Sequence, residues 1–192
     1  MALKRTFDED LEIAVNFHGH LCAGQVIGTR LCRIALEYFG IDEPETYRDL
    51  IAVSETDRCL ADTLISVAHC HPGRRRFKMY DYGKMAASFY DIQSGKAIRI
   101  ASKTTPQPVK GKDDVKEFFL AMPIEDLFTI QVIELPLTQY DLPGKSRVSV
   151  ECVQCGEKVT DGRFIDLDGD KYCQTCAFDS SYYRVIHDLE LH

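Results

Sequence analysis

The chain has 192 residues, a formal net charge of -7 at pH 7 and 45% hydrophobic residues, which suits a globular protein with one domain and a small second unit. The acidic balance disfavours nucleic acid as a partner, because phosphate backbones are usually bound by basic surfaces. The first residues are rich in charge and no run of about 18 apolar residues follows, so we expect a cytoplasmic protein with neither a signal peptide nor a membrane span.

Apolar residues recur at spacings of three and four between residues 8 and 39, which predicts helical structure up to Gly40. The polar run His18-Gly19-His20-Leu21-Cys22 interrupts this pattern, so we expect two helices, the second beginning near Cys22. Two imidazoles and one thiol therefore lie in a short segment just before a helix. Imidazole and thiolate together suit Zn(II) or another transition metal.

The segments that follow alternate between helix and strand patterns, which predicts an α+β core. Strands are expected at residues 51–54, 76–80, 88–92, 97–102 and 128–135. Helices are expected at residues 60–68 and 113–121, and Met122-Pro123 ends the second of them.

A second group of potential ligands accompanies the expected helix at residues 60–68. Cys59 precedes this helix, Asp62 lies in its first turn, and Cys70 follows it between two histidines. A carboxylate such as Asp62 can orient a histidine ligand. The spacing does not show that these groups meet the first histidines, so a metal or thiol site and a set of buried cysteines with surface histidines both stay open.

A change in composition marks a domain boundary beyond the last expected strand. Residues 136–147 contain two prolines, a glycine and several polar residues, which is typical of a linker. We therefore expect a core domain at residues 1–145 and a small tail domain at residues 146–192.

The tail carries the most specific motif, Cys152-x2-Cys155-x17-Cys173-x2-Cys176. Four thiolates in two close pairs can enclose Zn(II) in a tetrahedron, and they leave no open position for catalysis, so a structural zinc is expected. Asp168-Gly169 predicts a hairpin between the two pairs. A helix from the second pair to about Leu189 would complete a treble-clef-like finger.

Three blocks of the core resemble the FmdE family, the E-subunit family of formylmethanofuran dehydrogenase. They are Phe17-His18-Gly19-His20-Leu21-Cys22-Ala23-Gly24, then Glu55-Thr56-Asp57-Arg58-Cys59-Leu60-Ala61-Asp62, and Asp81-Tyr82-Gly83-Lys84-Met85-Ala86. The resemblance implies a thioredoxin-like mixed sheet flanked by helices, with a metal-binding active site. Two departures are Ala23, where the family usually has proline, and His69-Cys70-His71, where the family has other neighbours around the cysteine.

Carried over onto this sequence, the resemblance implies a core metal site that holds a second zinc or another transition metal. Its expected ligands are His18, His20, Cys22, Cys59 and Cys70. Among these, Cys22, His20 and Cys59 are the candidate catalytic residues. Lys84 and Tyr82 are expected to line the cleft.

Three functions stay open. The resemblance implies an accessory protein or subunit of anaerobic one-carbon (formyl) metabolism, a possible component of a molybdenum or tungsten formylmethanofuran dehydrogenase, and a homodimer. The second function is a zinc-finger adaptor or metal-delivery protein that docks a partner enzyme. The third is a thiol-based redox enzyme that uses Cys22, although the core has no Cys-x-x-Cys pair.

Overall fold

A computed structural model describes residues 3–186, and the chain divides into two compact units, Met1–Pro136 and Leu137–His192. We call them the core unit and the tail unit. The division comes a little before residue 145, near which composition places the boundary. Within the described residues, no helix is long and apolar enough to cross a membrane.

The first two helices are separated by a glycine turn, as the sequence predicts. Helix α1 (Phe7–His18) begins at a capping box in which Thr6 and Glu9 bond to each other's backbone N–H groups. It ends at Gly19, whose φ of 96° lies in the left-handed region. Helix α2 (Ala23–Phe39) follows at once, so the polar run stands at the junction of two helices.

A five-stranded mixed sheet forms the centre of the core unit, in the order β2-β1-β3-β4-β5. Its strands are β1 (Leu50–Ser54), β2 (Phe77–Met79), β3 (Ala86–Asp91), β4 (Lys96–Ser102) and β5 (Phe128–Ile133). Only the β1–β2 pair is parallel. The remaining helices are α3 (Cys59–Ser66), the 3-10 turn η1 (Pro72–Arg74), α4 (Val115–Leu120) and α5 (Ile124–Leu127). This confirms the predicted α+β class with a mixed sheet.

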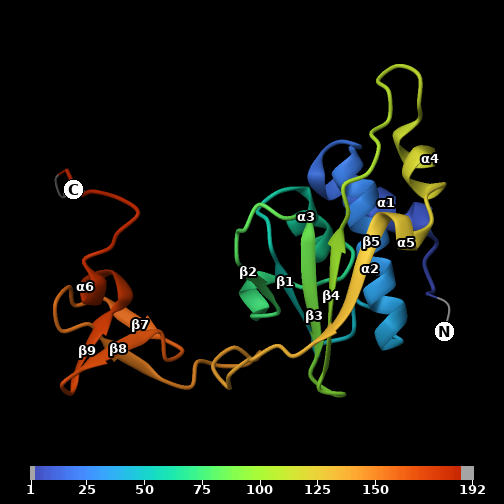
Figure 1. The fold of residues 1–192 in the computed structure, drawn as a ribbon. Helices are drawn as coiled ribbons and strands as arrows, with labels where there is room; N and C mark the ends of the chain where they lie inside the picture. Colours follow the sequence, from blue (N-terminus) through green and yellow to red (C-terminus); the bar gives the residue numbers. More distant parts are fainter. Residues whose placement is uncertain (1–2, 187–192) are drawn as a thin grey trace. The chain divides into compact units, whose positions relative to one another are not determined.

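Helices α1, α2 and α3 lie against one face of the sheet and share its hydrophobic core (Figure 1). Phe89 of β3 and Ile98 of β4 are paired across the sheet, and both are fully buried in this core. A buried carboxylate ties α1 to α2, since Asp10 accepts hydrogen bonds from Arg5, at 2.6 Å, and from Arg33. Packing and this ion pair together fix the α1–α2 junction in place.

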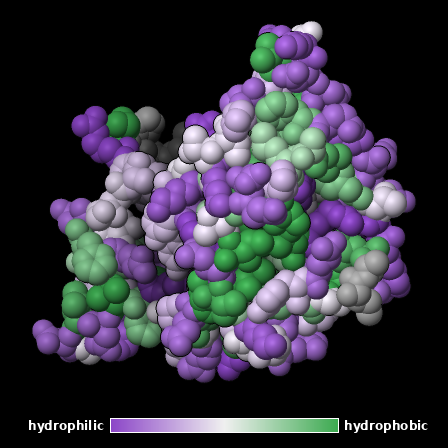
Figure 2. Space-filling model, turned by 45° about the vertical axis from the view of Figure 1, so that its right-hand side comes forward, coloured by the Kyte–Doolittle hydropathy of each residue, from purple (hydrophilic) through white to green (hydrophobic). Residues whose placement is uncertain are grey.

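The outer strand β5 leaves part of its apolar side uncovered. Ile130 and Val132 are paired with the buried Ile100 and Ile98, yet they are 44% and 77% exposed. Figure 2, in which β5 and α5 have turned toward the viewer, shows a hydrophobic area on this side of the core unit. Exposed apolar side chains on an edge strand are a feature that proteins usually cover or protect.

The tail unit consists of short antiparallel pairs and one short helix. Strands β6 (Ser149–Glu151) and β7 (Lys158–Thr160) form one pair, and β8 (Phe164–Leu167) and β9 (Asp170–Cys173) form the other. The second pair is the hairpin expected around Asp168-Gly169. Helix α6 spans only Gln174–Phe178.

The predicted helix to about Leu189 is wrong beyond α6. Asp179 ends the helix because its backbone is left-handed, with φ of 47°. Two serines follow, and they favour turns over helix. The stretch 179–186 has no helix, and residues 187–189 lie outside the described residues.

Candidate metal centres

The junction of α1 and α2 gathers the first three predicted ligands. His18 is the last residue of α1, and Cys22 is the N-cap of α2. The left-handed turn at Gly19 folds the intervening chain back, so that one ligand atom from each of His18, His20 and Cys22 lies within 4.8 Å of the others. The rings of His18 and His20 are 4.6 Å apart between centroids.

The start of α3 brings two further groups to this junction. The Sγ atoms of Cys22 and Cys59 are 3.7 Å apart, and His18 Nδ1 lies 2.7 Å from Asp62 Oδ2. Two thiolates on one tetrahedral zinc are separated by about 3.8 Å, given Zn–S bonds of about 2.3 Å. The two cysteines therefore already have the spacing of a shared metal ion.

Two glycines allow α2 and α3 to approach closely enough for this contact. A Cβ atom at Gly24 would lie 2.7 Å from Cys59 Cβ and 2.9 Å from Cys59 Sγ. A Cβ atom at Gly28 would lie 2.5 Å from Thr63 Oγ1. Any larger residue at either position would push the helices, and with them the two thiols, apart.

The state of His18 is the clearest sign that the group fits a metal. Its Nδ1 is held by Asp62, while its Nε2 is buried and has no hydrogen-bond partner. Buried polar atoms are rarely left unpaired. Carboxylate–histidine–metal arrangements use one ring nitrogen for the carboxylate and the other for the metal, which matches this side chain.

Burial also affects the thiols of the site. It raises the pKa of Cys59, and the neighbouring Cys22 thiol adds to the increase. In the metal-free protein this keeps Cys59 protonated at neutral pH. Because metals bind thiolates, metal binding here would release a proton and would strengthen as pH rises.

Cys70 lies apart from this group. It is fully buried in the hydrophobic core, with its Sγ 3.6 Å from the carbonyl of Leu50, and burial raises its pKa to about 12. The flanking His69 and His71 contact each other at 5.7 Å between ring centroids. Burial, followed by nearby arginines and His71, lowers the pKa of His69 to about 4. Cys70 remains a predicted ligand that the structure does not bring to His18, His20 and Cys22.

The two other predicted cleft residues are anchored beside the end of β1. The backbone N–H groups of Tyr82 and Lys84 both donate to the carbonyl oxygen of Glu55. The Lys84 Nζ atom lies 5.8 Å from the centroid of the Tyr82 ring, and both side chains are exposed. This places them next to the segment that leads into Cys59.

Two polar groups near Cys59 were not expected from the sequence. Arg99 of β4 binds both carboxylate oxygens of Glu55, at 2.5 Å and 2.8 Å, and lowers the pKa of Glu55. The fully buried Gln25 donates to the carbonyl of Cys59 at 3.0 Å, and its Oε1 has no partner. Only the pairing of strands far apart in the sequence brings Arg99 to Glu55, so no local signal could reveal it.

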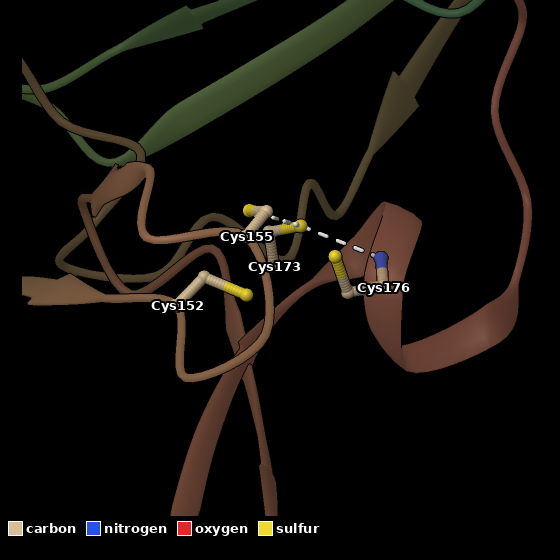
Figure 3. Close-up of side chains that lie close together, drawn as sticks. All are labelled: Cys152, Cys155, Cys173 and Cys176. Carbon is tan, nitrogen blue, oxygen red and sulfur yellow. Dashed lines mark hydrogen bonds between the residues drawn. The ribbon is translucent and has the colours of Figure 1, made fainter. Parts of the chain in front are cut away.

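The tail unit gathers Cys152, Cys155, Cys173 and Cys176. One sulfur from each lies within 4.8 Å of the others, and Figure 3 shows the four sulfurs facing a common space. Cys155 and Cys173 are 4.0 Å apart between sulfurs, and the backbone N–H of Cys176 donates to Cys173 Sγ at 3.4 Å. The turn after the first pair depends on Gly156, whose φ is 74°.

Backbone hydrogen bonds favour a thiolate in this cluster. The N–H groups of Cys155 and Cys173 lower the pKa of Cys152 to about 6. The side chain of Cys173 raises the pKa of Cys176, because four close thiols resist ionising together. A cation is the group that would allow all four to ionise, so the cluster can bind a metal ion.

Comparison with known proteins gives one matching family model and two informative relatives. The model is described as "FmdE, Molybdenum formylmethanofuran dehydrogenase operon", and it matches residues 17–128. A protein of Archaeoglobus fulgidus named "Probable S-adenosyl-L-methionine-binding protein" is 25% identical over 205 residues, covering 90% of this chain and 53% of that protein. This chain thus spans about half the length of that relative.

The second relative is a solved structure, that of an FmdE-like protein of tungsten formylmethanofuran dehydrogenase from Syntrophus aciditrophicus. It is 22% identical, with a TM-score of 0.55, and the match covers 95% of this chain and 100% of that one. At this identity the likeness supports the fold.

Proposed function

The chain belongs to the FmdE family, and from this we propose that it is a metal-binding accessory protein or subunit of anaerobic one-carbon (formyl) metabolism. The metal of the core unit would be zinc or another transition metal. In this proposal the chain assists a molybdenum or tungsten formylmethanofuran dehydrogenase-type enzyme, and it works in the cytoplasm as a homodimer.

The observation that supports the core metal best is the pairing of His18 and Asp62. The carboxylate holds Nδ1 and leaves the buried Nε2 without a partner, while the thiols of Cys22 and Cys59 stand at the separation of two zinc ligands. A solvated surface histidine would show no such unpaired buried nitrogen. The mixed imidazole and thiolate donors suit Zn(II).

The four side chains differ in exposure, which suggests different roles. Cys22, Cys59 and His18 are partly buried and would hold the metal, whereas His20 is exposed and can yield its position to a substrate. A bound metal would supply a Lewis acid at that position. We therefore keep His20, Cys22 and Cys59 as the candidate catalytic residues.

The tail cluster is proposed as a structural zinc finger. Its four cysteines would complete a tetrahedral shell and leave no position for a substrate. A unit of this size buries few apolar side chains, so the metal would supply much of its folding free energy. The finger is then free to dock a protein partner, which is also what an adaptor or metal-delivery protein would do.

Metal analysis of the full chain and two variants tests the two sites separately. The wild-type chain should hold about two metal ions, while Cys59→Ser and Cys176→Ser should each hold about one. One ion in the wild type and none in Cys176→Ser would leave only the finger. Recovery of pterin-dependent enzyme subunits with the native protein, and its mass by light scattering, test the partner and homodimer proposals.

A thiol enzyme that uses Cys22 is the second candidate. The 3.7 Å contact between Cys22 and Cys59 favours it, because the pair supplies the two thiols that the sequence lacks as a Cys-x-x-Cys motif. Alkylation of the metal-free protein tests it. If Cys22 reacts no faster than an ordinary exposed cysteine, this candidate is excluded.

A further inference from the structure

The thiols of Cys22 and Cys59 are close enough to react with each other as well as to share a metal. We propose that these two cysteines form a reversible disulfide, and that this bond and the core metal exclude each other. The disulfide depends only on the geometry of the pair. Its effect on metal binding rests on the proposed function, because it requires that both thiolates are ligands.

The geometry leaves a short path to the bond. The two sulfurs have to close from 3.7 Å to about 2.0 Å, the length of a disulfide. The Cys22 side chain makes no capping bond to α2, so it is free to turn toward Cys59. The absence of a side chain at Gly24 leaves the space beside Cys59 open.

Accessibility separates this pair from the other cysteines of the core unit. Cys22 and Cys59 are partly exposed, whereas Cys32 and Cys70 are fully buried. An oxidant in solution therefore reaches the pair first. Cys32 and Cys70 serve as internal controls within the same fold.

The reaction is a thiol–disulfide exchange with a low-molecular-weight disulfide such as oxidised glutathione. One thiolate of the pair attacks that disulfide, forms a mixed disulfide and releases one glutathione thiolate. The second thiolate then attacks the mixed disulfide and releases the other glutathione. Two protein thiols are oxidised, one glutathione disulfide is reduced, and the two protons leave on the two glutathione thiols.

Disulfide formation changes what the site offers to a metal. Thiolates are strong ligands for zinc, and the sulfurs of a disulfide are not, so oxidation removes both sulfur ligands at once. Only His18 and His20 of the gathered group would then remain. Conversely, a bound metal would hold both sulfurs and shield them from the oxidant.

The test compares metal-free and zinc-loaded full-length chain, both reduced and then exposed to oxidised glutathione. The products are trapped with N-ethylmaleimide and mapped by non-reducing peptide mass spectrometry. In the metal-free chain we expect a peptide linked through Cys22 and Cys59. Zinc should slow its formation by at least about tenfold, Cys22→Ser should abolish it, and Cys32→Ala should leave it unchanged.

The outcomes separate the two proposals. If the metal-free wild-type chain gives no such link, or links Cys22 only to tail cysteines, the disulfide proposal is wrong, whatever the metal analysis gives. If the link forms at the same rate with and without zinc, the disulfide stands and the core metal site fails. Because the central comparison uses the wild-type chain, it does not depend on the folding of a variant.

Discussion

Gly24 offers the sharpest test of how the core centre is built. A methyl group at this position would meet Cys59 Cβ at 2.7 Å, whereas ordinary contacts begin at 3.4 Å. The start of α2 or of α3 must then move by about 0.7 Å. This displacement acts directly on the pair of Cys22 and Cys59, because one is the N-cap of α2 and the other is the first residue of α3.

Stability and metal binding should respond differently to Gly24→Ala. Overpacking costs about 1 to 3 kcal/mol, and replacing a helical glycine with alanine returns about 1 kcal/mol, so the free energy of unfolding should fall by only about 0 to 2 kcal/mol. Core metal affinity should fall by at least about tenfold, because the sulfurs no longer meet at the required separation.

Two measurements and one control complete this test. Denaturation by urea gives the free energy of unfolding, and competition with a chromophoric chelator gives the affinity of the core site. Gly73→Ala is the matched control, since a Cβ atom there would meet nothing within 4 Å, and both quantities should stay at their wild-type values. If Gly24→Ala binds the core metal as tightly as the wild type does, the close approach of α2 and α3 does not determine the ligand geometry.

Three further predictions address the carboxylate partner of His18, the pH dependence of stability and the tail. Asp62→Asn should weaken core metal binding by about 10- to 100-fold by chelator competition, while the exposed Glu12→Gln should not, and equal affinities would show that His18 needs no carboxylate. Arg99 holds the pKa of Glu55 below its ordinary value of 4.5, so the pair stabilises the fold above that pH and the gain is lost as pH falls through the folded pKa. The stability difference between wild type and Glu55→Gln, measured in urea from about pH 3 to 7, should therefore shrink in acid, and a difference that grows there would contradict the pairing. Chelation of the finger metal should abolish the ordered NMR signals of the β8–β9 hairpin and leave those of the core sheet, and an unchanged hairpin would mean that the tail folds without metal.

Much of the core fold follows from local signals. The spacing of apolar residues in α1 and α2, with glycines at their ends, predicts both helices, and Gly19 predicts the break that forms the site. The strands are short and apolar, so their positions are predicted well from the same pattern. The order of the strands is not, because pairing between distant segments leaves no mark on either sequence alone.

The tail helix shows where a local pattern misleads. Tyr182, Tyr183, Val185 and Ile186 have an apolar pattern that favours a continuing helix, yet all four are exposed in the structure. A helix of this kind is stabilised mainly by burying its apolar face. Without a packing partner for that face, the left-handed turn at Asp179 ends the helix.

The two centres also differ in how far the sequence reveals them. Each cysteine pair of the tail is held within four consecutive residues, so the motif itself shows the donors. The core centre joins the end of α1, the start of α2 and the start of α3, and only its His18-to-Cys22 part is visible as a motif. Asp62 was predicted as a possible orienting carboxylate, but its contact with His18 needed the structure.

The two metals should also differ in how they relate to folding. The core unit has an extensive hydrophobic core of its own, drawn from three helices and the sheet, so its centre can lose a metal or form a disulfide while the fold persists. In the tail unit, Cys152 is the one apolar-class residue that is buried among the described residues. Its metal is therefore part of the fold, whereas the core metal is exchangeable. Exchange at a standing site is the property that regulation by oxidation, or transfer of a metal to a partner, requires.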